Sequence, residues 1–389
     1  MTANMATRFY PRLLTPPEQS FFLFGPRGSG KSTWARRAFP NAYRFDLLDE
    51  GLYQELLSDA SLFASRLRTF KRGGWVWVDE VQRLPSLLNE VHRFIEEAGL
   101  RFILTGSSAR KLRRTGVNLL AGRALTRTMY PLLPAELGRD FDLEKVLSYG
   151  SLPIVWSSPS KQETLKAYVQ TYLKEEIQAE ALARNLAGFS RFLPVAALFH
   201  AQTLNVSALA RDAGVSRMTV SGYLDVLEDT LLAFRLPAYE AKLRVRERKH
   251  PKLYWIDPGL VRAVKRQLTP LAQEERGALL EGLVAVVLRA YGEYTGLFDD
   301  LAFWSPTDAA KTEVDFLLRK GDRFVAIEVK SSPRLSSDAL PGLRAIGSLR
   351  GLERRILVYT GMRELRTEDG IDAWPVQRLF EAIESKTLF

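Results

Sequence analysis

Eight residues near the start of the chain fit the pattern G-x-x-x-x-G-K-S without a mismatch. They lie between a short apolar run, 20–24, and a segment, 32–39, that favours a helix and is ended by Pro40. Glycines let such a loop turn its backbone N–H groups toward a phosphate, and the helix N-terminus adds partial positive charge. The lysine of this pattern reaches the β- and γ-phosphates, and the hydroxyl that follows it binds Mg²⁺. The pattern therefore predicts a site for ATP and Mg²⁺ formed by nine residues, with the lysine also catalytic: Gly25, Pro26, Arg27, Gly28, Ser29, Gly30, Lys31, Ser32 and Thr33.

Two adjacent acids, Asp79 and Glu80, follow the apolar run Trp75-Val76-Trp77-Val78. A buried carboxylate is costly without a partner, so acids at the end of such a strand indicate a bound cation or a reaction. Asp79 is expected to hold the Mg²⁺, and Glu80 is expected to polarise the attacking water. A protein that only binds nucleotide would not need Glu80. The alternative is an exposed strand end that takes no part in chemistry.

A third polar segment, Thr105-Gly106-Ser107-Ser108, ends another apolar strand. A hydroxyl at this place would sense the γ-phosphate or position the water, and Ser107 is the first choice. Arg123 is a candidate arginine finger or sensor, and Arg113 and Arg114 are further candidates. The competing interpretation is that each arginine is a solvated surface charge.

Residues 206–224 predict a helix, a turn at a glycine and a second helix, which is helix-turn-helix spacing. Ser207 and Ser216 are candidate N-caps of the two helices. The second helix would present Arg217, Thr219 and Ser221 to a groove of DNA. Because this helix carries little charge, we expect recognition of DNA structure or backbone rather than of base sequence.

Two strands, 231–239 and 252–256, follow the predicted helices and flank a basic tip. This arrangement predicts a wing whose charges meet phosphate. The charged residues of the tip are Lys242, Arg244, Arg246, Arg248 and Lys249. The alternative is a winged helix that serves as a protein-contact module or as a lid on the nucleotide site.

The last acidic pattern is Glu313-Val314-Asp315, followed by Glu328-Val329-Lys330. Residues i and i+2 of a strand share a face, so Glu328 and Lys330 point the same way, and Asp315 joins them if its strand pairs alongside. Glu281 interrupts an apolar helix upstream and would point into the same cluster. The pattern resembles the PD-(D/E)xK nuclease fold, which implies Mg²⁺ or Mn²⁺ on Asp315 and Glu328, with Glu281 at or just behind the metal. Lys330 would then orient or activate water against a phosphodiester. The alternative is a degenerate copy that only holds DNA or only stabilises the fold.

These residues need strands and helices to position them. Strands are expected at 20–24, 43–48, 75–78, 102–105 and 124–130, and helices at 32–39, 51–70 and 85–98. Strand alternating with helix predicts an α/β fold with a sheet covered by helices on both faces. Residues 138–200 are predicted to be helical. The final part of the chain is expected to contain a helix, strands at 313–318 and 323–330, a helix at 338–348, a strand at 354–360 and a closing helix.

Composition narrows the chemistry further. The chain has 389 residues, no cysteine and three histidines, which excludes disulfides and thiolate sites and leaves little material for a zinc site. A formal net charge of +10 is the sign expected for a phosphate-rich partner such as DNA. No apolar run approaches the length of a membrane span, so we expect a cytoplasmic protein that does not enter the membrane.

The order of the motifs resembles a widespread bacterial and archaeal ATPase family with an AAA-type N-terminal domain and a C-terminal region long described as of unknown function. The resemblance rests on segments spread over nearly the whole chain: 25–31, 78–82, 105–108, 120–123, 130–132, 253–260 and 328–332. One departure is Ser32, where threonine is commoner, and serine binds Mg²⁺ equally well. The resemblance implies an AAA-like ATPase, a winged-helix module and a nuclease-like terminus. Together with the pattern of elements along the chain, it predicts an AAA-like ATPase core at 1–137, a helical region at 138–200, a winged helix-turn-helix at 201–265 and a PD-(D/E)xK nuclease-like domain at 266–389. It supplies no substrate.

Taken together, these patterns predict an ATP-hydrolysing, DNA-binding protein that remodels or translocates on DNA, branched DNA included. A homo-oligomer would be natural if an arginine finger acts in trans. An alternative is a nucleotide-dependent regulatory or defence switch that binds protein partners and cuts nothing. A further alternative is a structural ATPase with inert appendages.

Overall fold

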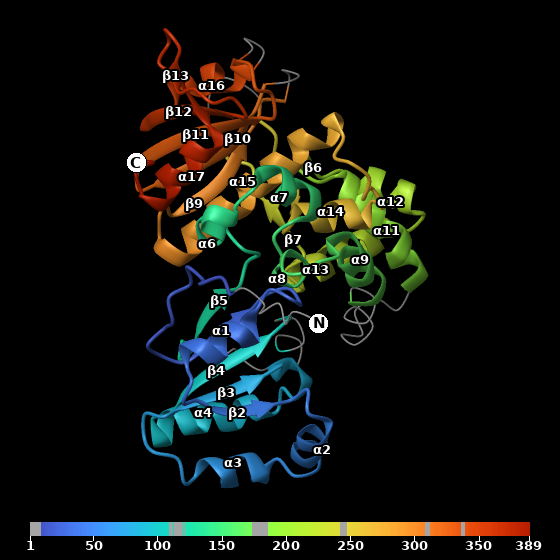
Figure 1. Ribbon diagram of the computed structural model, residues 1–389, viewed down its shortest axis with the longest axis vertical. Coiled ribbons are helices and arrows are strands. Elements are labelled where there is room, and N and C mark those ends of the chain that lie inside the picture. The colour runs from blue at the N-terminus through green and yellow to red at the C-terminus, as the bar shows by residue number, and fades with distance from the viewer. Residues whose placement is uncertain are drawn as a thin grey trace, which may run out of the picture. The chain divides into compact units, whose positions relative to one another are not determined.

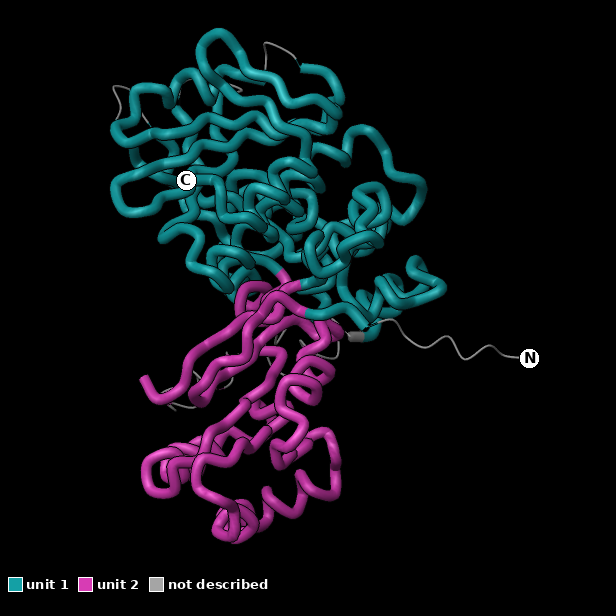
Figure 2. Tube along the Cα trace, turned by 60° about the vertical axis from the view of Figure 1, so that its left-hand side comes forward, with its two compact units in different colours: residues 1–11, 131–225, 233–389 teal, residues 12–130, 226–232 magenta. Residues whose placement is uncertain are grey.

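The computed structural model describes residues 9–108, 112, 120, 122–172, 186–241, 247–307, 312–335 and 339–389. The chain forms two compact units, one of residues 12–130 and 226–232, the other of residues 1–11, 131–225 and 233–389 (Figure 2). The division into four domains at 137, 200 and 265 stays a prediction. Among the helices in the described ranges, none combines the length and apolar character needed to cross a membrane.

The unit that contains residues 12–130 is built on a five-stranded parallel sheet (Figure 1). The spatial order is β2-β3-β4-β1-β5. The strands are β1 (Phe21–Phe24), β2 (Tyr43–Asp46), β3 (Trp75–Asp79), β4 (Arg101–Gly106) and β5 (Leu125–Thr128). The helices of this unit are α1 (Lys31–Ala38), α2 (Glu50–Ser58), α3 (Ser61–Leu67) and α4 (Leu87–Ala98), with a 3₁₀ turn η1 (Val81–Arg83) after β3.

Alternate residues of the buried strands pack on opposite faces of this sheet. On one face Phe21 lies edge-on to Trp34 of α1, with ring centres 6.1 Å apart, and to Trp75 at 6.2 Å. On the other face Phe22 joins an apolar cluster that takes in Phe63 of α3 together with residues of α2 and α4. Helices therefore cover both faces of a parallel sheet, as the alternation of strand and helix predicts.

The second unit begins with short helices. They are α6 (Pro134–Leu137), η2 (Gly138–Asp140), α7 (Leu143–Tyr149), α8 (Pro153–Trp156), α9 (Lys161–Ala167), the π-helical turn η3 (Tyr168–Tyr172) and α11 (Leu186–Leu198). Two helices, α12 (Val206–Ala213) and α13 (Arg217–Asp229), precede a small antiparallel sheet of order β6-β8-β7. Its strands are β6 (Gln202–Thr203), β7 (Ala233–Leu236) and β8 (Lys252–Trp255).

The rest of the second unit is a mixed six-stranded sheet of order β13-β14-β12-β11-β10-β9 with its helices. The helices are α14 (Pro258–Val264), α15 (Gln273–Thr295), α16 (Pro341–Ala345), η5 (Ile346–Ser348) and α17 (Val376–Glu384). The strands are β9 (Asp300–Trp304), β10 (Val314–Lys320), β11 (Arg323–Lys330), β12 (Leu352–Tyr359), β13 (Leu365–Arg366) and β14 (Asp372–Pro375). Strand β11 is antiparallel to β10 and parallel to β12, so the two acidic strands, β10 and β11, are neighbours and neither is an edge strand.

The structure refines several predicted elements. The helical stretch expected at 51–70 is two helices, because Asp59 and Ala60 break it and the Asp59 side chain accepts from the Ser61 N–H at 2.9 Å. The strand expected at 231–239 is shorter, since β7 ends at Leu236 and the chain then turns away toward β9.

Candidate nucleotide site and acidic cluster

The glycine-rich loop joins the end of β1 to the start of α1, as its motif predicts. Gly28 has a φ of 77° and Gly30 a φ of 89°, both in the left-handed region that favours glycine. Gly25 is required for a different reason, because a Cβ there would stand 2.6 Å from the Met129 carbonyl oxygen. The first turn of α1 has no acidic residue that would repel an anion.

The interior of this loop fits an anion. Lys31 is buried, and its Nζ donates to the carbonyl oxygens of Gly25 at 2.7 Å and Pro26 at 3.3 Å. The Ser29 Oγ is buried and has no hydrogen-bond partner within the described ranges. Arg12 supports the loop by donating to the Ser29 carbonyl oxygen at 2.8 Å. A phosphate would accept hydrogen bonds from both the ammonium and the unpartnered hydroxyl.

Asp79, at the end of β3, is the centre of a polar network beside the loop. Its Oδ1 accepts from the Thr105 hydroxyl at 2.5 Å and from the Ser32 hydroxyl at 3.3 Å. Its Oδ2 accepts from Arg44 at 2.7 Å, and the Arg44 guanidinium stacks over the Trp77 ring at 4.4 Å. The structure thus places Ser32 and Asp79, the two predicted Mg²⁺ residues, against each other.

Glu80 and Ser107 are joined by a residue that the sequence analysis did not select. The Gln82 side-chain amide donates to Glu80 Oε2 at 2.5 Å and to Ser107 Oγ at 3.1 Å. Glu80 itself has a φ of 57°, an uncommon conformation for a residue with a side chain. The Gln82 amide therefore links Glu80 and Ser107, the two residues predicted to act on water.

Arg123 lies elsewhere in the unit, where its guanidinium pairs with Glu96 of α4 in a half-exposed ion pair. This contact leaves the arginine-finger assignment a prediction. Arg113 and Arg114 lie outside the described residues.

Helices α12 and α13 present the predicted polar face. Arg217 and Ser221 are exposed, and Thr219 is half-buried. The prediction that Ser207 caps the first helix is wrong, since the Asn205 side chain accepts from the Ala208 N–H at 3.0 Å. Ser216 does cap the second, because its hydroxyl accepts from the Thr219 N–H at 3.1 Å.

The segment between β7 and β8 is not a free-standing hairpin where the structure describes it. The Tyr239 N–H donates to the Phe303 carbonyl of β9 at 2.7 Å, and the Arg248 N–H donates to the Ser305 carbonyl at 2.9 Å. Of the five predicted basic residues, Arg248 and Lys249 are exposed, and Lys249 lies 3.4 Å from Glu240. Lys242, Arg244 and Arg246 lie outside the described residues.

The acidic cluster forms around the paired strands β10 and β11. Asp315 Oδ2 accepts from the Val329 N–H at 2.9 Å, and Glu328 Oε2 accepts from the Asp315 N–H at 3.3 Å. Glu328 Oε1 accepts from Lys330 Nζ at 2.5 Å. Glu281 reaches the same cluster from α15. The structure therefore brings together all four residues of the predicted pattern.

A cation of the chain itself lies among these acids. The Lys252 Nζ is 2.9 Å from Glu281, 2.9 Å from Asp315 and 3.4 Å from Glu313. The prediction that Glu281, Asp315 and Glu328 hold Mg²⁺ or Mn²⁺ is therefore not supported. In the ranges that the structure describes, no group of three or more His, Asp or Glu side chains is arranged to hold a metal ion.

Burial and charge pull the pKa values of this cluster in opposite directions. Burial alone would lower the pKa of Lys252, but the carboxylates of Asp315 and Glu281 raise it well above its usual value, so the ammonium stays charged. Burial, and then repulsion from Asp315, raise the pKa of Glu281 to about 7 despite the nearby Lys252. Burial and Asp315 also hold the pKa of Glu328 well above its usual value, against the attraction of Lys330.

Several contributing residues were missed by the sequence analysis, although some carried a signal. Thr105 stands in the same motif as Ser107, and Gln82 follows Glu80 by two positions. Lys252 and Tyr254 alternate with apolar residues in a buried strand, a pattern that puts both on one face. Nothing in the sequence around Arg44 distinguishes it from the other arginines of the chain.

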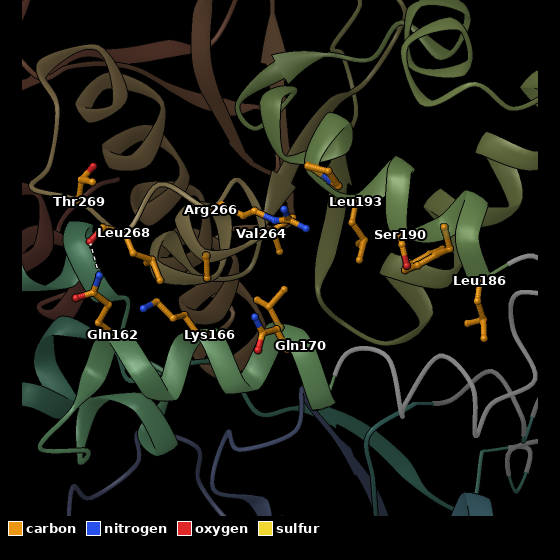
Figure 3. A pocket seen from close by; sticks show the side chains of 14 residues that line it. Gln162, Lys166, Gln170, Leu186, Ser190, Leu193, Val264, Arg266, Leu268 and Thr269 are labelled. Atoms are coloured by element: carbon orange, nitrogen blue, oxygen red, sulfur yellow. Dashed lines mark hydrogen bonds between the residues drawn. The ribbon is translucent and has the colours of Figure 1, made fainter.

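The pocket drawn in Figure 3 does not coincide with either site. It has a volume of about 550 Å³ and lies among α9, η3, α11 and the residues that end and follow α14. Its lining includes Leu193 and Val264, with Lys166 and Arg266 as its cationic groups. None of the predicted site residues within the described ranges lines it.

Three models of known families match the chain. Residues 17–138 match the family model of an AAA domain. Residues 140–271 and 276–379 match two models, each described as a domain of unknown function (DUF8612 and DUF4143). The chain therefore contains a P-loop AAA domain, followed by two domains of unknown function.

The chain is also similar to individual proteins. It is 26% identical over 369 residues to an uncharacterized protein of Mycobacterium tuberculosis, covering 92% of this chain and 80% of the relative. It is 21% identical over 307 residues to one from Methanocaldococcus jannaschii, covering 71% and 68%. Among solved structures, the Aeropyrum pernix ORC1 protein in complex with DNA is 15% identical, covers 66% of this chain and 87% of that chain, and has a TM-score of 0.25. A Vibrio cholerae protein is 14% identical, covers 95% and 99%, and has a TM-score of 0.24. At these TM-scores the likeness supports no conclusion about fold or function.

Proposed function

We propose that the chain hydrolyses ATP with Mg²⁺ at the loop between β1 and α1. The observation that carries the proposal is the Asp79 carboxylate, which is buried and bonded to the Ser32 hydroxyl beside the loop. Ser32 and Asp79 would hold Mg²⁺, which neutralises charge on the β- and γ-phosphates when it is bound. The unpartnered Ser29 hydroxyl and the oxygen donor set both fit such an occupant.

The chain's own residues divide the remaining tasks. The loop N–H groups and the Lys31 ammonium bind phosphate oxygens and orient the γ-phosphoryl group. Glu80 accepts a proton from the attacking water, and Gln82 holds the Glu80 carboxylate in place. Because Gln82 also holds Ser107, this serine is positioned to contact the same water or the γ-phosphate.

Steady-state ATP turnover by the full chain tests this proposal, with Lys31→Ala and Glu80→Gln as variants. We expect Lys31→Ala to lose both nucleotide binding and turnover. Glu80→Gln should retain binding and lose turnover by about a hundredfold or more, because only the proton acceptor is removed. Arg66 is a half-buried arginine of α3 that pairs with Glu55. The variant Arg66→Ala is the matched control, and its ATP turnover should equal that of the wild type. Equal turnover in Glu80→Gln and the wild type would refute the assignment of the base.

We further propose that α12, α13 and the small sheet form a winged helix that binds DNA. Support comes from the helix pair with its Gly214 turn, from the exposed Arg217 and Ser221, and from the net charge of +10. ATP hydrolysis would then remodel the bound DNA or move the protein along it, branched DNA included. An arginine finger such as Arg123 would require a second copy of the chain.

We also propose that the six-stranded sheet with α15 has the PD-(D/E)xK nuclease-like fold. The convergence of Glu281, Asp315, Glu328 and Lys330 supports this assignment.

One observation favours a second candidate, a nucleotide-dependent switch that binds protein partners. Met218, the second residue of α13, has 84% of its surface exposed, and an apolar side chain on that face suits a protein better than a phosphate backbone. This candidate predicts ATP turnover that is indifferent to DNA.

A further inference from the structure

A cation that lies among the acids of the cluster is built into the chain. Lys252 is 1% exposed, and its Nζ lies near one oxygen each of Glu281, Glu313 and Asp315. The ammonium donates hydrogen bonds to Glu281 Oε1 and Asp315 Oδ1, both at 2.9 Å, and forms an ion pair with Glu313 at 3.4 Å. The group is therefore held by three carboxylates where the nuclease pattern would place a metal.

The backbone fixes Lys252 in this position. It is the first residue of β8, whose backbone pairs with Thr203 of β6 and Leu236 of β7 on its two sides. Tyr254, two residues further on the same face, donates to Glu281 Oε1 at 2.5 Å. One strand thus presents two donors to the cluster, and neither is a mobile surface group.

Further oxygens of Asp315 and Glu328 are occupied as well. Asp315 Oδ2 accepts from the Val329 N–H, and Glu328 accepts from the Asp315 N–H and from Lys330. A divalent ion needs several such oxygens at about 2.0–2.6 Å, and it would be repelled by an ammonium already bound to the same atoms. Expelling Lys252 would strand a buried charge, which is costly.

We propose that Lys252 is the resident cation of this cluster, so that the nuclease-like domain binds no Mg²⁺ or Mn²⁺ there and does not cleave phosphodiester bonds. The carboxylates instead fasten β8 to β10 and α15. This inference concerns only residues of the second unit and holds whether or not the chain hydrolyses ATP.

Titration of the nucleotide-free full chain with Mn²⁺ tests the proposal, with free Mn²⁺ measured by electron paramagnetic resonance. The wild type and Asp315→Asn should bind the same number of ions. Lys252→Ala should gain one bound Mn²⁺, because the carboxylates lose their cation, and the double variant Lys252→Ala, Asp315→Asn should lose that ion again. Lys320→Ala, a lysine of the same sheet outside the cluster, is the matched control and should resemble the wild type.

Two results of the Mn²⁺ titration would overturn the proposal. One is a Mn²⁺ ion on the wild-type chain that disappears in Asp315→Asn. The other is a folded Lys252→Ala variant, judged by circular dichroism, that gains no ion. If Lys252→Ala does not fold, the comparison of wild type with Asp315→Asn still decides the question. Cleavage of DNA by the wild type in Mg²⁺ or Mn²⁺, lost in Asp315→Asn, would also contradict it.

Discussion

Asp79 is the residue on which the nucleotide site converges. Two hydroxyls and one guanidinium donate to its carboxylate, and they come from α1, β2 and β4. The Thr105 hydroxyl makes the shortest of these contacts, at 2.5 Å. The Thr105 Oγ1 in turn accepts from the Trp77 indole N–H at 2.9 Å. Thr105 therefore sets the direction of the carboxylate that we assign to Mg²⁺.

Replacing Thr105 by valine tests this positioning role. The valine fits the β-branched shape but removes the donor to Asp79, and losing one hydrogen bond to a buried charged group costs about 1.5–3 kcal/mol. We expect ATP turnover at low Mg²⁺ to fall about tenfold or more and to recover partly at high Mg²⁺. Thr105→Ser keeps the hydroxyl and should restore the Mg²⁺ dependence. A Thr105→Val variant with an unchanged Mg²⁺ dependence would rule out the positioning role.

At the level of elements, β8 connects to α15 through a buried histidine. The His200 Nδ1 accepts from the Trp255 N–H at 3.1 Å. On the other side of the ring a Cβ on Gly282 would stand 2.1 Å from Nε2, so only glycine lets α15 approach this closely. Burial, and then repulsion from Lys265, lower the pKa of His200 to about 3.

This histidine predicts a pH dependence of stability. Its folded pKa lies below the unfolded value of about 6.5, so its contribution is complete above that pH and is lost as the pH falls toward 3. Between pH 8 and pH 5 the wild type should lose about 2 kcal/mol more unfolding free energy than His200→Gln, whose amide oxygen keeps an acceptor. Urea unfolding at each pH measures this difference. His92 is exposed, and His92→Gln is the control. If the unfolding free energies of the wild type and of His200→Gln change in parallel with pH, His200 is not the source of the pH dependence.

The nucleotide site and the acidic cluster differ in how much of each the sequence predicts. The strands of the first sheet were located because buried parallel strands are continuous apolar runs, as in Phe21–Phe24 and Trp75–Val78. The loop, Asp79 and Glu80 follow from local patterns within a few residues of those strands. Lys252 could not be assigned in this way, because it meets Asp315 63 positions further along the chain and only the tertiary fold brings them together. The break at Asp59 was also missed, since no glycine or proline marks it.

At the scale of the whole molecule, the chain combines an AAA-class nucleotide unit with a second unit that carries the exposed polar face of α13. The net charge of +10 favours association with a polyanion but does not identify one. The central claim is that ATP hydrolysis responds to DNA bound at α13. We assign the acidic cluster no part in this claim, because the Lys252 ammonium lies among its carboxylates.

ATP turnover of the full chain, measured with and without duplex, single-stranded and branched DNA, tests this claim most directly. We predict that at least one DNA raises turnover in the wild type. Arg217→Ala should weaken that DNA's binding several-fold and reduce the slope of log affinity against log salt by about one, because one phosphate contact is lost. Arg66→Ala should behave as the wild type. Turnover that no DNA changes, together with no DNA binding at low salt, would contradict the account and favour the protein-binding switch.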